Sequence, residues 1–469
     1  MRRLSGFDAA FLYFETPTTH LHVGQVCVFD PSTAPDGHSF EDVRQLLKDR
    51  IHLIPPFRRR LAQVPFGLHH PVWIEDPDFD LDYHLRRAAL PSPGGPAELA
   101  DFSADVMSRP LDRHRPPWEM HIVEGLEGGM VGAVSKVHHA AIDGVSGAEA
   151  TAQLLDLAPE RGHVPPADPP WEPEPLPSGP HLVRSAVADL AKQPLVAARA
   201  VGRTARSAGL LWWRNRRREG EPPPSAFSGP RTSLQTAVGR DRRVAFAEVS
   251  LDTVKQIKDT FGGTVNDVVL AICAGALRSL LAARGEHPDE ALVAAVPVSL
   301  RGEEDRDIGG NRASGMLVSL ATNLEDPVER LACIAAGSKA AKDQERILGA
   351  EDLADWAEIV APPLAASLAR LAARFRLAER YGPPFNVVIS NFRGSPFPLY
   401  SVGARMLSAY PFGPVADGAP LNITVQSYVD KLCFGLSAGR EAVPEIWDIP
   451  EYLDDALTEL SKAANQRSS

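Results

Sequence analysis

Cysteine is scarce in this chain, which has four among its 469 residues. The four lie far apart, with no CxxC pair and no neighbouring histidine cluster. The sequence therefore predicts neither a disulfide framework nor a cysteine-based zinc site, and it suits a reducing compartment. Because each lies in an apolar stretch, we expect small, buried side chains at Cys27, Cys273, Cys333 and Cys433.

Positive charge is also in short supply. The chain has 49 lysines and arginines against 60 aspartates and glutamates, and its formal net charge is −11. Binding to nucleic acids depends on lysines and arginines that neutralise phosphates. An acidic balance of this size argues against a nucleic-acid partner.

Long apolar runs are missing too. A helix that crosses a membrane needs about 20 mostly apolar residues, and the longest candidate run, 268–277, ends at Arg278. The segment 1–8 carries two arginines, but no apolar stretch follows, so we expect no signal peptide. The expected location is cytoplasmic, and any contact with a membrane is expected to be peripheral.

The chain has 469 residues, of which 44% are hydrophobic. That is enough to form two large domains or about three smaller ones. Strand and helix periodicities occur together in both its first and its last third. Strands are predicted at 22–29, 131–137, 244–251, 294–299, 313–320, 386–389 and 421–428, and helices at 40–51 and 264–283. This mixture predicts an α/β protein with one unit on each side of a central segment.

The central segment differs in composition. Residues 165–180 are rich in proline and cannot form a regular element. The basic stretch 181–218 then looks helical, and its arginines lie near Trp212 and Trp213. Such a helix suits an anionic lipid interface, and it is equally compatible with a crossover helix packed on the protein. We predict domains at 1–160 and 236–469, joined by a Pro-rich and helical linker at 161–235.

An HHxxxDG pattern at 138–144 directly follows the predicted strand at 131–137. Successive side chains of a strand point to opposite faces, so we expect His138 and His139 to point apart, one into a cavity and the other to a structural role. A neutral imidazole suits removal of a proton from a hydroxyl. Gly144 allows a tight turn, and the S-x-x-E pattern at 146–149 predicts a capped helix after it.

Asp143 follows His139 by four residues, and two roles compete for it. It orients the imidazole, as the acid of a catalytic triad does, or it pairs with an arginine and fixes the loop. A histidine pair can also be buried or bind a metal, but no third ligand lies nearby in the sequence. The residues therefore favour acyl transfer to a hydroxyl as the leading function, and they predict no metal.

A second pattern begins at Thr264, which is predicted to cap the helix at 264–283, with Asp267 as its capping-box partner and Gly285 as the stop. Asn266 then lies in the first turn, where backbone N–H groups favour negative charge. It is a candidate for orienting substrate or stabilising an oxyanion, and simple capping is the alternative.

Together these patterns resemble the bacterial wax ester synthase/diacylglycerol acyltransferase family. That family belongs to the CoA-dependent acyltransferases, with chloramphenicol acetyltransferase and peptide-synthetase condensation domains. The likeness covers nearly the whole chain. Besides HHxxxDG it includes SGFDAAFL at 5–12, HLHVG at 20–24, PLDRHRPPWE at 110–119, NDVVLA at 266–271, PVSLR at 297–301, SN at 390–391, PLY at 398–400 and LNITV at 421–425.

The resemblance implies two similar-sized chloramphenicol-acetyltransferase-like subdomains with a tunnel at their interface. It implies that His139 is the base that deprotonates a diacylglycerol or long-chain alcohol hydroxyl, whose oxygen attacks an acyl-CoA thioester. Acyl-CoA is then a co-substrate, and no metal or redox cofactor is needed. Asp143 would be structural, with Arg58 as a candidate partner, although Arg58 also fits a solvated basic face. Peripheral contact with the inner membrane or with lipid droplets suits such substrates.

Two departures from the family pattern concern the acceptor. Pro117 replaces a usual leucine, and 392–396 reads FRGSP where the family usually has VPGP after Ser-Asn. Two alternatives therefore stay open: a related acyltransferase with another lipid or polyketide hydroxyl as acceptor, and a non-catalytic lipid-binding homologue. The sequence gives no acceptor preference, acyl chain length or oligomeric state.

Overall fold

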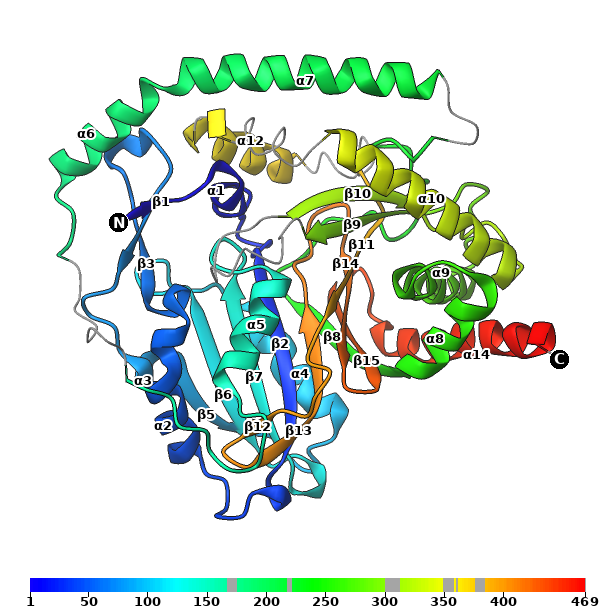
Figure 1. Ribbon diagram of the computed structural model, residues 1–469, viewed down its shortest axis with the longest axis horizontal. Coiled ribbons are helices and arrows are strands. Elements are labelled where there is room, and N and C mark those ends of the chain that lie inside the picture. The colour runs from blue at the N-terminus through cyan, green and yellow to red at the C-terminus, as the bar shows by residue number, and fades with distance from the viewer. Residues whose placement is uncertain are drawn as a thin grey trace.

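The computed structural model describes residues 1–166, 175–216, 222–299, 313–348, 358–359, 362–375 and 384–468. Over these residues the strands form two six-stranded sheets and one three-stranded sheet. Figure 1 shows the two large sheets side by side, each with its own helices. Two lobes of mixed strands and helices confirm the predicted α/β fold.

The sheet of the first lobe has the order β12-β13-β2-β7-β6-β5. Its strands are β12 (Tyr400–Ser401), β13 (Ala404–Phe412), β2 (His22–Asp30), β7 (Val131–His138), β6 (Trp118–Glu124) and β5 (Leu85–Ala89). Helices α2 (Phe40–Arg50) and α5 (Gly144–Leu154) share one buried apolar cluster with it, and α4 (Pro96–Ser108) belongs to another. The two strands predicted in this part of the sequence, β2 and β7, are neighbours at the middle of the sheet.

The sheet of the second lobe has the order β10-β9-β11-β14-β15-β8. Its strands are β10 (Ala313–Ser319), β9 (Val293–Ser299), β11 (Val387–Arg393), β14 (Leu421–Tyr428), β15 (Lys431–Gly439) and β8 (Arg242–Ser250). Helices α8 (Leu251–Phe261), α9 (Val265–Ala283), α10 (Pro327–Leu348) and α14 (Ile449–Ser468) share its apolar core. All five strands predicted after position 240 are present within three or four residues of the predicted ends.

The later part of the chain also contributes strands to the sheet of the first lobe. Strand β13 comes after position 400, yet it pairs antiparallel with β2, so the later half of the sequence supplies two strands to the first sheet. Local hydrophobic periodicity predicts a strand but not its partner, which explains why a division at 160 and 236 does not show this contribution of the later chain to the first sheet. Those two boundaries stay predictions.

The linker contains two helices, α6 (Gly179–Leu190) and α7 (Gln193–Asn215). Arg3 binds α6 through its Nε, 3.0 Å from Oδ2 of Asp189, and its Nη2, 2.9 Å from Oγ of Ser185. Helix α7 runs along one side of the molecule and contacts α10 of the second lobe (Figure 1). The linker therefore contacts both lobes, and the part of the predicted proline-rich stretch at 167–174 lies outside the described residues.

Helix α9 has the length and apolar composition of a membrane-crossing segment, and it is the one such helix among the residues that the structure describes. Its side chains from Asp267 to Leu277 are buried in the second lobe, so core packing accounts for its composition. Cys273 lies inside it, and Cys27 and Cys433 are buried too. The prediction was wrong for Cys333, which is exposed on α10 because the neighbouring Leu331 and Ile334 face the core instead.

Candidate active site

His139 follows the last residue of β7 and is half-buried. Its backbone N–H donates to the carbonyl of Leu21, with an N···O distance of 2.9 Å. Its ring stacks on Phe11 of α1 (Gly6–Tyr13), with 4.2 Å between the ring centroids and 7° between the planes. The backbone is thus held by Leu21, the ring is stacked on Phe11, and the imidazole is not sealed in the core.

His138 has different partners. Its Nδ1 accepts from the backbone N–H of Ala140 at 3.0 Å, so the proton of the neutral ring lies on Nε2, which is 3.1 Å from Oε1 of Glu15. Burial, with a smaller effect from Arg113, lowers the pKa of His138 to about 3. A neutral, buried ring bound to its own loop fits the structural role expected for one of the two histidines, and the strand alternation explains why His139 is the accessible member of the pair.

A buried ion pair between β7 and β6 was not predicted from the sequence. Lys136 is fully buried, and its Nζ lies 2.8 Å from Oε1 of Glu119, its cross-strand partner on β6. The same Nζ donates to the carbonyls of Val106 and Arg109, at 2.7 and 2.9 Å. These contacts fasten the PLDRHRPPWE segment to β7. A lysine inside an otherwise apolar strand was the available signal.

Glu15 is the second missed residue. Its carboxylate pairs with Arg113 and approaches two histidine rings, those of His138 and, at 3.7 Å, His22. It lies only 11% exposed at the centre of this group. The Glu15 carboxylate therefore connects Arg113 to the ring of His138, directly before His139 in the chain.

Asp143 is the N-cap of α5, and its Oδ1 accepts from the backbone N–H and the hydroxyl of Ser146, at 2.8 and 2.7 Å. The predicted S-x-x-E capping box was wrong, because an aspartate three residues earlier caps the helix and moves its start to Gly144. The Nε of Arg58 lies 3.8 Å from Oε2 of Glu75. A pairing of Arg58 with Asp143 stays a prediction, as does a role for Asp143 in orienting the imidazole.

The capping box at the start of α9 has the predicted form. The backbone N–H of Thr264 donates to Oδ2 of Asp267 at 2.8 Å, and that of Asp267 donates to the Thr264 hydroxyl at 3.3 Å. Asp267 and Thr264 therefore cap this helix together. The Nδ2 of Asn391 on β11 lies 3.5 Å from Oδ1 of Asn266, so two segments of the family pattern meet. A substrate role for Asn266 stays a prediction.

The lobes meet close to this region. The side-chain amide of Gln25 on β2 donates to Oε1 of Gln426 on β14 at 2.8 Å, and its own Oε1 accepts from Thr151 on α5 at 2.9 Å. Strand β2, helix α5 and the second lobe are therefore joined by one chain of hydrogen bonds. The predicted tunnel between the lobes stays a prediction. Among the described residues no group of three His, Cys, Asp or Glu is arranged to hold a metal ion.

Buried histidines make the stability of this region depend on pH. Burial lowers the pKa of His138 to about 3, that of His70 to about 4, and that of His22 well below its usual 6.5. The unfolded chain binds these protons near pH 6.5 and the folded chain does not, so stability is full above pH 6.5 and falls as the pH drops towards 4. Each such proton contributes about 1.4 kcal/mol per pH unit. Urea unfolding at pH 7.5, 6.0 and 5.0 should show this loss, and equal free energies of unfolding would contradict it.

Residues 4–269 match the wax ester synthase/diacylglycerol acyltransferase catalytic domain, and residues 309–461 match the C-terminal domain of the same family. The chain belongs to this family. The membership confirms the predicted family and the prediction of an acyltransferase enzyme. A Mycobacterium tuberculosis protein that bears the name of a candidate diacylglycerol O-acyltransferase is 36% identical over 468 residues, covering 100% of this chain and 91% of its own. Another from the same organism, with the same activity in its name, is 38% identical over 98% of this chain.

Solved structures agree with the assignment to this acyltransferase family. The wax ester synthase/diacylglycerol acyltransferase from Marinobacter aquaeolei VT8 is 31% identical and superposes with a TM-score of 0.70 over 99% of this chain and 100% of that one. The first condensation domain of the calcium-dependent antibiotic synthetase is 16% identical, with a TM-score of 0.58 over 99% and 96% of the two chains. At that identity the likeness shows the two-lobed fold alone.

Proposed function

We propose that this acyltransferase transfers a fatty acyl group from acyl-CoA to the hydroxyl of diacylglycerol or of a long-chain alcohol, with His139 as the general base. The observation that carries the proposal is the contrast between the two rings of the motif. The ring of His138 is buried, hydrogen-bonded and neutral, whereas the ring of His139 is partly exposed and stacks on Phe11.

In the proposed reaction, His139 accepts the proton of the acceptor hydroxyl while its oxygen forms a bond with the thioester carbonyl carbon. A tetrahedral oxyanion forms, the C–S bond breaks, and the imidazolium returns the proton to the CoA thiolate. Donation from Asn391 to Oδ1 of Asn266 leaves the Asn266 amide hydrogens for another acceptor. Those hydrogens support a role for Asn266 beside the oxyanion. The reaction as written needs neither a metal nor a redox cofactor.

The test uses the purified full chain with labelled palmitoyl-CoA and two competing acceptors, hexadecanol and dipalmitoylglycerol. Formation of either labelled ester supports the proposal, and their ratio identifies the preferred acceptor. If neither ester forms, the proposal fails, and the alternatives with another hydroxyl acceptor or with lipid binding alone take its place. The intact HHxxxDG motif in a member of this acyltransferase family favours catalysis over lipid binding alone.

We also propose that α7 contacts an anionic lipid surface, which would place the protein at the cytoplasmic face of a membrane or on lipid droplets. Its exposed apolar side chains include Leu195, Val201, Leu210 and Trp213, and the arginines at 199, 203 and 206 are exposed beside them. Apolar side chains flanked by arginines bind such interfaces in two ways: the apolar groups are buried among the lipids, and the arginines are attracted to anionic headgroups. Pelleting with phosphatidylglycerol vesicles should fall for a Leu210→Ser/Trp213→Ser variant. Equal pelleting of the variant and the wild type would refute the contact.

A further inference from the structure

Phe11 covers one face of the imidazole of His139. The two rings lie almost parallel, with 4.2 Å between their centroids and 7° between their planes. The lone pair and the N–H bond of a neutral imidazole both lie in the plane of its ring. The stack therefore occupies a π face of the candidate base and leaves the directions of its two nitrogens parallel to the Phe11 ring.

Helix α1 holds the Phe11 ring in place. Phe7, one turn earlier, meets this ring edge to face, with 5.5 Å between the centroids and 87° between the planes. The end of the helix is bound by Arg113, whose Nη2 donates to the carbonyl of Leu12 at 3.3 Å. The side chain of Leu12 is buried in one apolar cluster with Ala140, the residue that follows the candidate base. The stack therefore belongs to a helix that packs on the HHxxxDG turn itself.

Stacking restricts a torsion that is otherwise soft. Rotation about the Cβ–Cγ bond of histidine has only a broad preference, so a half-exposed imidazole samples many ring orientations. A general base has to lie within hydrogen-bond reach of the proton that it removes, and a misplacement of about 1 Å can cost about 10²-fold in rate. Contact with the face of Phe11 limits the imidazole to orientations parallel to that face. Phe11 thereby fixes the plane in which the nitrogens of His139 point.

The Phe11 ring also interacts differently with the two protonation states of the base. The face of an aromatic ring carries negative charge density, and it attracts a cation within about 6 Å of its centroid. In the proposed reaction His139 becomes an imidazolium when it takes the proton of the acceptor hydroxyl, and its centroid lies 4.2 Å from that of Phe11. The attraction favours the charged state that forms during the reaction over the neutral ground state, which is the requirement for a catalytic effect.

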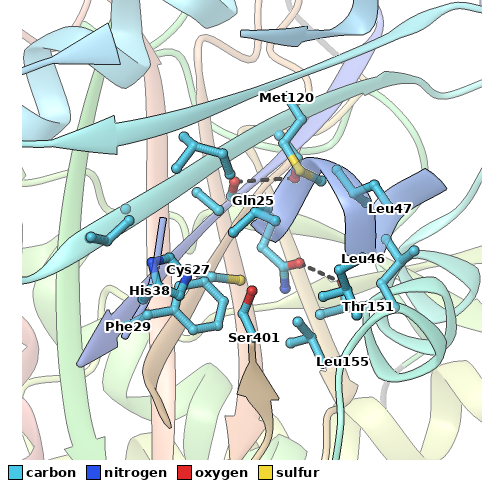
Figure 2. A pocket seen from close by; sticks show the side chains of 17 residues that line it. Gln25, Cys27, Phe29, His38, Leu46, Leu47, Met120, Thr151, Leu155 and Ser401 are labelled. Atoms are coloured by element: carbon cyan, nitrogen blue, oxygen red, sulfur yellow. Dashed lines mark hydrogen bonds between the residues drawn. The ribbon is translucent and has the colours of Figure 1, made fainter. Parts of the chain in front are cut away.

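We propose that Phe11 is a positioning residue for the general base: its ring fixes the plane of the His139 imidazole and stabilises the imidazolium that forms during acyl transfer. The assignment rests on the proposed function. Phe11 is not part of the walls of the apolar cavity in this lobe, which are formed by side chains that include Gln25, Leu46 and Met120 (Figure 2). Substitutions at Phe11 therefore leave those walls as they are, and their effect is expected in kcat.

The first test compares Phe11→Leu with Phe11→Tyr. Leucine keeps an apolar contact but has no aromatic face, so kcat with palmitoyl-CoA and hexadecanol should fall by about 3–30-fold, while the KM of both substrates stays within about twofold of the wild type. Tyrosine keeps the aromatic face and should retain about half of the wild-type kcat or more. The proposal is overturned by a wild-type kcat in Phe11→Leu, by an equal loss in both variants, or by a loss that appears only as a higher KM.

Phe79→Leu is the matched control. Phe79 is also half-buried and also stacks on a histidine, His84, with 5.5 Å between the centroids and 15° between the planes, but His84 is not the proposed base. The control loses the same kind of contact and should keep the wild-type kcat. A loss as large as that of Phe11→Leu would overturn the proposal, because any such stack in this lobe would then have the effect. Thermal unfolding checks each variant, and Phe11→Met replaces Phe11→Leu if the latter does not fold.

A double substitution tests whether Phe11 acts through His139. In a His139→Ala background, Phe11→Leu should have no further effect on the residual rate of ester formation, because the base that Phe11 positions is missing. A further loss as large as that in the wild-type background contradicts the proposal.

If the wild type makes no ester, the proposed function fails separately, and nuclear magnetic resonance with isotope-labelled histidine measures the position of the ring. The His139 signal, identified by its loss in His139→Ala, should lie upfield of that of an exposed histidine because of the ring current of Phe11. A return to the exposed value in Phe11→Leu, but not in Phe11→Tyr, supports the assigned contact. An unchanged signal in Phe11→Leu overturns it.

Discussion

Replacing His139 with alanine is expected to lower kcat by about 10²–10⁴-fold, the usual contribution of a general base. The folded state should survive, because the ring is half-buried and its contact with Phe11 is a stacking contact rather than a core ion pair. The measurement is ester formation from labelled palmitoyl-CoA, with circular dichroism to confirm that the variant is folded.

His138→Asn is the comparison for this experiment. His138 is buried against Glu15, so its substitution should lower the thermal midpoint as well as the activity. A His139→Ala enzyme that still makes ester at the wild-type rate would remove the assigned base. Equal loss of stability in the two variants would show instead that both rings are structural.

The largest expected effect on stability comes from Glu119. Glu119→Leu leaves the fully buried Lys136 without its carboxylate, and the loss of one partner from a buried pair costs about 3–5 kcal/mol. Burial already lowers the pKa of Lys136, and Glu119 opposes this effect, so the variant lysine should lose its proton more readily.

A double-mutant cycle isolates this pair. Glu119→Leu/Lys136→Met removes both charges together, and it should recover a large part of the stability that either single substitution loses. Urea unfolding of the four proteins measures the coupling. Additive losses would mean that the two side chains contribute independently, for instance through the hydrogen bonds from Lys136 to Val106 and Arg109.

The sequence predicted the parts of the site that depend on local order. Alternation along β7 separates His138 from His139, and a threonine followed by an aspartate three residues later predicts the capping box at the start of α9. The error at Ser146 arose because two capping residues compete, and local pattern alone does not choose between starts one turn apart. Glu15 was missed because its partners, His138 and Arg113, are about a hundred residues away, and no periodicity links them.

The position of β13 in the sheet of the first lobe has a consequence for biosynthesis. On the ribosome, β2 and β7 emerge early and can pair at once, but the other edge of β2 has no neighbour until Phe412 has been synthesised. An unpaired strand edge is a template for aggregation. The nascent first lobe must therefore wait, with one backbone edge unprotected, for most of the polypeptide to be translated, and a transcript truncated at the linker encodes no complete lobe.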